Sequence, residues 1–191
     1  VTPRGVWGRT GPSAFTTVEH WLGRPLESSA DPEPLILRYL AAFGPATPAD
    51  VTAWSGIAGA AELLERMPPR LRTYRDERGR ELFDVADGRL RDPDTPAPVR
   101  FLPEYDNVLL SHADRSRIVA PGMRPLNGVG WGMVLVDGFT AARWRLDAKT
   151  SVITVEPFRN LTKAERGEVE AEAVALGAFL GAPAASIRIA R

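Results

Sequence analysis

The sequence predicts an α+β chain in which a winged helix-turn-helix precedes a small β-rich, barrel-like domain with one long C-terminal helix. Three observations lead to this prediction. Apolar residues recur at helical spacing over residues 31–67, two short strand-like runs follow them, and alternating strands and a capped helix fill residues 131–180. We therefore divide the chain into an irregular N-terminal segment, 1–30, a winged helix-turn-helix domain, 31–85, a linker, 86–98, and a β-rich domain, 99–191.

Capping residues mark the first two helices. Thr16 and Glu19 fit a capping box for a short helix through Leu22, which Gly23 ends. Asp31 and Pro32 suit the start of a helix over residues 31–43, and Gly44 is its expected stop. Its apolar face is expected to contain Leu35, Ile36, Tyr39, Leu40 and Phe43.

Two more helices and a hairpin complete the predicted winged helix-turn-helix. Thr47 caps a short helix with Pro48 at its first position, and Ser55-Gly56 forms a tight turn. A third helix is expected over residues 57–67, ended by Pro68-Pro69. The strand-like runs that follow are joined by Glu77-Arg78-Gly79, where Gly79 supplies a positive φ.

In the C-terminal part, strand-like runs and turn residues follow one another in the order typical of a β-meander. Strands are expected at residues 132–137, 140–146 and 151–157, with Asp137-Gly138 as a two-residue turn. Thr162 caps a helix to about Leu180, with Gly181 as its stop and a stripe of Val169, Ala173, Leu176 and Leu180. Residues 186–191 add an edge strand.

Composition excludes several protein classes. The 191 residues carry 24 basic and 24 acidic side chains, so any basic surface must be local. The absence of cysteine excludes disulfides and cysteine-ligated zinc. No apolar run or signal-peptide core indicates a membrane, and we expect a cytoplasmic, nucleoid-associated location. Because residue 1 is Val within a loop-like stretch, we interpret the chain as the back part of a longer one, or as the product of an alternative start codon.

A local basic cluster is the main candidate for binding. Residues 66–80 hold six arginines against two acidic residues, and arginine suits phosphate and minor-groove contacts. The third helix lacks the Arg, Asn and Gln set that reads base edges, so the expected partner is double-stranded DNA, contacted through backbone and shape. The candidate DNA-binding residues are Thr47, Arg66, Arg70, Arg72, Arg75, Arg78 and Arg80. The alternatives are a solvated hairpin paired with Asp76, Glu77 and Glu81, and a protein-interaction module.

A second group combines tyrosine, aspartate and arginine. Asp106 or Asp114 would be a base and Arg115 or Arg117 an anion clamp in a catalytic interpretation; in a structural one the group, which includes Tyr105, positions a loop. His112 is expected at a loop surface, with a proton-shuttle role as the alternative. NGVGWG at 127–132 lacks the strand-to-helix context of a nucleotide loop, and we expect neither cofactor nor metal.

Four blocks together resemble a known family. They are PRGVWGR, YLAAFGPATPADVTAWSG, FLPEYDNVLLSHADRSRI and VLVDGFTAARWRL. In this order they resemble the winged-helix superfamily of bacterial DNA glycosylases that unhook bulky alkyl adducts and interstrand crosslinks, including the azinomycin-resistance enzyme. The resemblance implies a C-terminal half of such an enzyme, with an N-terminal winged-helix region as a partner. It also implies a catalytic Gln-x-Gln motif, and this sequence contains no Gln. No catalytic residue is therefore carried over.

Overall fold

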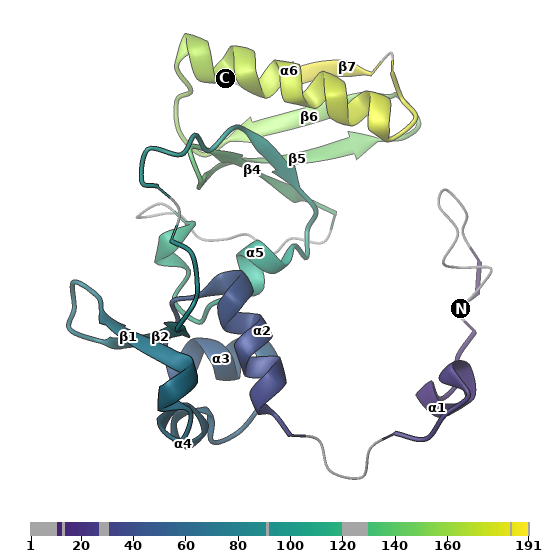
Figure 1. Ribbon diagram of the computed structural model, residues 1–191. Helices are drawn as coiled ribbons and strands as arrows, with labels where there is room; N and C mark the ends of the chain where they lie inside the picture. Colours follow the sequence, from purple (N-terminus) through teal and green to yellow (C-terminus); the bar gives the residue numbers. More distant parts are fainter. Residues whose placement is uncertain are drawn as a thin grey trace. The chain divides into compact units, whose positions relative to one another are not determined.

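A computed structural model describes residues 11–12, 14–26, 31–90, 92–119, 130–183 and 185–190 (Figure 1). Internal contacts divide the chain into Val1–Pro34 and Leu35–Arg191, which we describe separately. The described residues form a mixed α+β structure with six α-helices and two sheets, and the last helix is the longest.

The first unit contains one complete short helix, α1 (Val18–Leu22). Its cap is Thr17, whose hydroxyl accepts a hydrogen bond from His20 N at 3.2 Å, and not Thr16 as the sequence predicts. Two adjacent threonines offer the same cap chemistry, so a shift of one residue is an easy error. Gly23 ends the helix at φ 65°, as expected. No residue of α1 is buried.

The second unit begins with the helix–hairpin region, by which we mean residues 35–85. It contains the greater part of α2 (Glu33–Phe43), α3 (Pro48–Ser55) and α4 (Ala60–Glu65), then β1 (Leu71–Arg75) and β2 (Glu81–Val85). The α4 helix is shorter than the predicted 57–67, because Gly59 in the left-handed region precedes it and Pro68 and Pro69 follow in a 3-10 turn. β1 and β2 pair antiparallel, with Gly79 at φ 75° in the loop.

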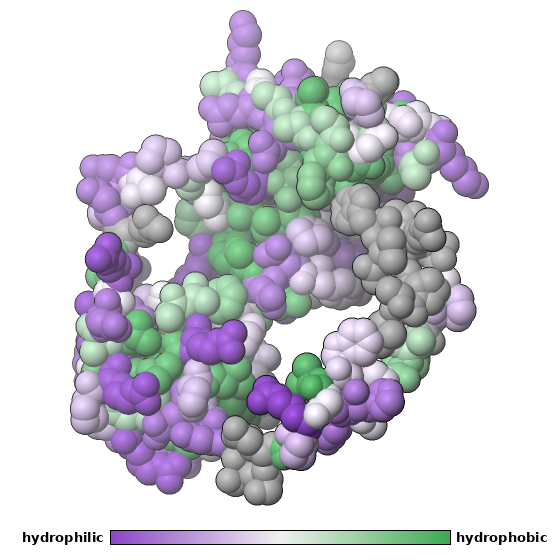
Figure 2. Space-filling model, turned by 45° about the vertical axis from the view of Figure 1, so that its right-hand side comes forward, coloured by the Kyte–Doolittle hydropathy of each residue, from purple (hydrophilic) through white to green (hydrophobic). Residues whose placement is uncertain are grey.

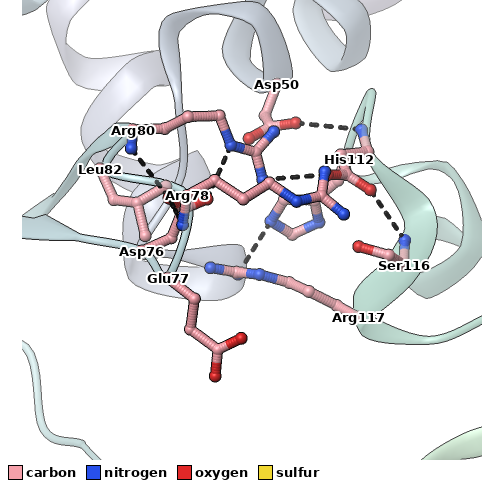
Figure 3. Close-up of a pocket in the computed structure, with 10 residues that line it drawn as sticks. Asp50, Asp76, Glu77, Arg78, Arg80, Leu82, His112, Ser116 and Arg117 are labelled. Atoms are coloured by element: carbon pink, nitrogen blue, oxygen red, sulfur yellow. Dashed lines mark hydrogen bonds and ion pairs between the residues drawn. The ribbon is translucent and has the colours of Figure 1, made fainter.

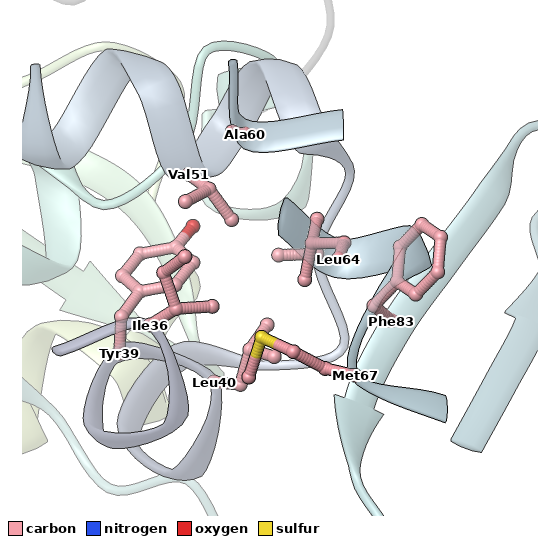
Figure 4. Packing of buried hydrophobic residues seen from close by; sticks show 9 residues of the cluster. Ile36, Tyr39, Leu40, Val51, Ala60, Leu64, Met67 and Phe83 are labelled. Atoms are coloured by element: carbon pink, nitrogen blue, oxygen red, sulfur yellow. The ribbon is translucent and has the colours of Figure 1, made fainter. Parts of the chain in front are cut away.

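A single apolar core holds this region together. Figure 4 shows Ile36, Tyr39, Leu40, Leu64 and Met67 directed toward one another from α2, α4 and the turn that follows α4. Leu35, expected on the apolar face, is 40% exposed. The loop after α2 also joins the hairpin, since Ala46 exchanges two backbone hydrogen bonds with Phe83, at 2.9 and 2.8 Å.

Gly44 ends α2 for a steric reason. Its backbone is not in the left-handed region, but a Cβ at this position would lie 2.5 Å from Leu40 O and 2.6 Å from Asp84 Oδ1. A side chain here would have to displace backbone, so only glycine allows the chain to turn this closely past β2.

The C-terminal sheet has the order β3-β4-β5-β6-β7. All neighbours are antiparallel except β6 and β7, and among the described residues the order has two edges, where the sequence predicts a barrel-like domain. The predicted meander and its Asp137-Gly138 turn are present, both turn residues having positive φ. The strands are β3 (Arg100–Leu102), β4 (Gly132–Val136), β5 (Phe139–Asp147), β6 (Val152–Pro157) and β7 (Ser186–Ile189).

The long helix α6 (Lys163–Phe179) lies along this sheet (Figure 1). Its buried residues are Val169, Ala173 and Gly177, so the predicted stripe is correct at two positions, while Leu176 and Leu180 are half-buried. Gly177 lets α6 pack closely against the segment that follows it, because a Cβ there would lie 3.0 Å from Ala182 O. Trp144 Nε1 donates to Leu102 O at 2.8 Å and ties β5 to β3.

Apolar side chains also reach the surface. In Figure 2 hydrophobic residues (green) show between hydrophilic ones (purple) in the upper part of the view, and α6 contributes exposed Val174 and Phe179. Among the described residues, no helix combines the length and the apolar character needed to cross a membrane.

Candidate functional site

The six arginines of residues 66–80 do not share one environment. Arg66, Arg70 and Arg75 are exposed. Arg72 is half-buried, lies 3.7 Å from Asp84 Oδ2 and donates to Gly88 O. Arg78 and Arg80 both reach Asp114, 34 or more residues further along the chain. The charges of Arg72, Arg78 and Arg80 are therefore partly compensated by carboxylates, of which only Asp76, the partner of Arg80, was expected.

A charged pocket of about 370 Å³ lies where the hairpin loop meets residues 112–117 (Figure 3). His112 and Ser116 contribute to its polar lining, and the ionised residues around it are three arginines and four acids: Arg78, Arg80, Arg117, Asp50, Asp76, Glu77 and Asp114. The pocket is thus a mixed ionic site and not a uniformly basic one.

Asp114 is the link between the hairpin and this segment. Its Oδ2 accepts from Arg80 Nη2 at 2.9 Å and Arg78 Nη1 at 3.3 Å, while Oδ1 accepts from Ser116 N at 3.0 Å. The hydrogen bonds from Ser116, followed by those from Arg80, lower the pKa of Asp114 to about 2. Asp114 is therefore ionised at neutral pH and fixes both arginines.

Asp76 shapes the hairpin loop from inside. Its Oδ1 accepts from the backbone N–H groups of Arg78 and Arg80, at 2.9 and 2.8 Å, and its Oδ2 accepts from Arg80 Nε at 2.6 Å. These hydrogen bonds outweigh desolvation and lower the pKa of Asp76. The loop conformation and the direction of Arg80 are consequently set by one carboxylate.

Asp50 anchors the other wall of the pocket. With Thr47 it forms the capping box of α3, accepting from Thr47 N at 2.8 Å and Thr47 Oγ1 at 2.7 Å. Its second oxygen accepts from Ala113 N at 2.9 Å and Asp114 N at 3.4 Å. Burial alone would raise the pKa of Asp50, but these hydrogen bonds lower it below its ordinary value. Because Thr47 is buried and its hydroxyl donates to Asp50, we do not retain Thr47 as a phosphate ligand.

His112 is buried and not at a loop surface as expected. Ser111 Oγ donates to Val108 O at 3.1 Å and so accepts from His112 Nδ1 at 2.8 Å. This assigns the ring proton to Nδ1 and leaves Nε2 to accept from Arg117 Nη1 at 3.2 Å. Burial, then the Arg117 charge, lowers the pKa of His112, so the ring is neutral at pH 7. Tyr39 O–H, whose pKa burial raises, supports this segment by donating to Ser111 O at 2.7 Å.

The structure divides the second predicted group. Asp114 and Arg117 line the pocket, whereas Tyr105, Asp106 and Arg115 are outside its lining. Tyr105 is 63% exposed, and Asp106 caps α5 (Asn107–Leu110) by accepting from Val108 N at 2.8 Å. The sequence did not single out Asp50 or Ser116 for this site. The Thr-Pro-Ala-Asp pattern at 47–50 signals a capping box, but no local pattern places Asp50 beside Ala113.

The chain is similar to proteins of one known family. A family model described as "DNA glycosylase AlkZ-like" matches residues 1–179. Among solved structures the chain is similar to the Streptomyces sahachiroi DNA glycosylase AlkZ, with a TM-score of 0.58 and 22% identity over 82% of this chain and 45% of that one. At this identity the likeness concerns the fold, and the chain spans less than half the length of that protein. No curated protein matches significantly.

Proposed function

This chain belongs to the AlkZ-like DNA glycosylase family, and from that premise we propose that it acts in DNA repair as part of a glycosylase for bulky alkyl adducts or interstrand crosslinks. The family match over residues 1–179 is the observation that carries the proposal. Within such an enzyme this chain would hold duplex DNA, and an N-terminal winged-helix region of the same family would be its partner.

The helix–hairpin region supports the DNA-contact role. Three helices followed by an antiparallel hairpin is the order expected of a winged helix-turn-helix, and this order supports the proposal that the hairpin would contact the DNA backbone or minor groove. Arg66 begins this arginine-rich stretch and Arg75 ends β1, and both side chains are exposed. Their charges would contact phosphates, so the binding would depend on backbone and shape more than on sequence.

We assign the chemical step to residues outside this chain. The Gln-x-Gln motif implied by the family resemblance requires glutamine, and none of the 191 residues is glutamine. This chain would therefore contribute binding, and base release would require residues outside it.

Duplex binding tests the contact role. We expect log affinity to fall linearly with log salt, and Arg66→Ala with Arg75→Ala to flatten the slope by about two units, one per phosphate contact. The matched control is Lys149→Ala with Arg188→Ala, which removes two exposed charges from the sheet end of the chain and should leave the slope unchanged. Fluorescence anisotropy of a labelled duplex measures both. Equal slopes for the two double variants would refute the proposed surface.

Base release tests the division of labour. A duplex carrying a bulky alkylated guanine is incubated with this chain, and abasic sites are detected by alkaline cleavage. We expect no release above the rate without protein. Release by this chain would show that its own residues perform the chemistry.

A further inference from the structure

Arg117 differs from the other arginines of the charged pocket. Arg78 and Arg80 contact Asp114, but Arg117 has no carboxylate within ion-pair distance among the described residues. Within the part of the chain that the structure describes, its side chain hydrogen-bonds to His112 Nε2, at 3.2 Å. A guanidinium carries five N–H donors, so most of its donors face the pocket and solvent without an anionic acceptor.

The contact with His112 orients this cation. His112 is 8% exposed, and Ser111 fixes its proton on Nδ1, so Nε2 is a stationary acceptor. An arginine bound to a neutral, buried acceptor keeps its full charge while losing conformational freedom. This differs from the carboxylate pairs of Arg80, which offset the charge they position.

A second cation of the pocket suits an anion. Arg78 lies on the same pocket with 68% of its side chain exposed and a single 3.3 Å contact to Asp114. The Ser116 hydroxyl also lines the pocket, but it donates to the Asp114 carboxylate. Of the acids, Asp76 and Asp114 are occupied by hydrogen bonds, and Figure 3 shows the Glu77 carboxylate directed away from the Arg117 head group.

We propose that Arg117, together with Arg78, binds one phosphate of the DNA backbone, and that His112 is the positioning residue for Arg117. The inference rests on the proposed function for the identity of the ligand. The pocket volume of about 370 Å³ is ample for a phosphate group, and a planar guanidinium donates to phosphate oxygens in a forked geometry. The loop 112–117 would thus grip DNA beside the hairpin.

Duplex binding of single variants tests the site. We expect Arg117→Ala to weaken binding roughly tenfold and to flatten the salt slope by about one unit, with Arg117→Lys less affected. Arg115→Ala is the matched control, because the neighbouring arginine is outside the pocket lining. If Arg117→Ala and Arg115→Ala bind alike, the site is refuted, while the effect of Arg66→Ala with Arg75→Ala still decides the proposed function separately.

The positioning role of His112 has its own readout. His112→Phe keeps a buried ring but removes the acceptor, so it should lose as much affinity as Arg117→Ala, and combining the two should cause no further loss. His112→Asn retains a side-chain acceptor and should restore part of the binding. Thermal melting excludes a folding defect. Additive losses in the double variant would overturn the positioning role.

A small probe separates the possible sources of the phosphate. The chain has two histidines, so NMR resolves the His112 ring once His20→Asn assigns the other signal. Inorganic phosphate should shift the His112 ring signals in the parent chain and not in Arg117→Ala. No shift refutes an anion site. A shift without any effect of Arg117→Ala on duplex binding supports an anion site but overturns its assignment to DNA.

Discussion

Two helices of this chain begin with the same capping box, and they use it differently. In α3 Thr47 pairs with Asp50, and in α6 Thr162 pairs with Glu165. In both, the threonine hydroxyl accepts the N3 backbone N–H at 3.2 Å. The acidic side chain in turn accepts from the threonine N–H, at 2.8 Å in α3 and 2.7 Å in α6. The local geometry is therefore nearly identical.

The surroundings of the two boxes differ. Glu165 is at the surface, and its remaining acceptor capacity goes to Arg159, six residues away, with Nη2 at 2.6 Å. Asp50 is 5% exposed and accepts from Ala113, 63 residues away. One box is a local cap, whereas the other also fixes the loop that carries His112 and Asp114. The comparison teaches that a buried helix cap can also form tertiary hydrogen bonds to a distant segment of the chain.

The largest expected effect on stability is the loss of the Asp50 hydrogen bonds to the distant segment. Asp50→Asn keeps one acceptor oxygen but places an N–H₂ group against donors, and we expect the free energy of unfolding to fall by about 2–4 kcal/mol. Glu165→Gln, the matched change in the exposed box, should cost less than about 1 kcal/mol. Urea denaturation measures both. Equal losses of stability would show that burial of the Asp50 box adds nothing to its contribution.

The pH dependence of stability should separate the boxes next. The pKa of Asp50 is lowered, and that of Glu165 is lowered to about 2, first by Arg159. A carboxylate with a depressed folded-state pKa stabilises the fold above its unfolded pKa, and this contribution is lost as pH falls through the folded value. Wild-type stability should therefore decline between about pH 4.5 and about pH 2. Glu165→Gln should flatten this decline more than Asp50→Asn, because the large lowering of the pKa is at Glu165; the reverse order would contradict this expectation.

Removal of the threonine hydroxyls should also destabilise the two boxes unequally, by smaller amounts. We expect Thr47→Ala to cost about 2 kcal/mol and Thr162→Ala about 0.5 kcal/mol, the two ends of the range for N-cap removal. The larger loss at Thr47 follows because its buried hydroxyl also donates to Asp50 at 2.7 Å. Thermal melting of the two variants provides the measurement, and a larger loss at Thr162 would argue against it.

The smallest expected effect is at Asp114, the half-buried anchor of the same loop. Asp114→Asn weakens the contacts with Arg78 and Arg80 but keeps an acceptor for Ser116, so it should cost about 0.5 kcal/mol. High salt should reduce the difference from wild type, because the paired arginines are partly solvated. A cost as large as that of Asp50→Asn would mean that the surface pair, and not the buried cap, holds residues 112–117.

Local patterns account for most of the fold that was predicted. Thr47 and Thr162 as caps, Gly79 in the hairpin and Asp137-Gly138 as a turn all lie within a few residues of the groups they serve. The sequence missed β3, since three residues give no measurable alternation, and it overextended α4.

The candidate site was predictable only in part. The arginine cluster and Asp114 stand out by composition, but the partners of Asp114 are 34 and 36 residues distant. Burial of His112 depends on Tyr39, whose ring centroid is 6.3 Å from its own. Such pairings are set by tertiary packing, which leaves no periodic signal in the sequence. The predicted linker at 86–98 and the DNA contacts of the arginines stay predictions.

The shared carboxylate of Asp50 also implies an order of assembly. Thr47 is three residues from Asp50, so α3 can close its cap within a short stretch of nascent chain. Ala113 reaches the same carboxylate only after the hairpin and the following segment have been made. We therefore expect the 112–117 loop to fold late, by docking onto a helix end that has already formed.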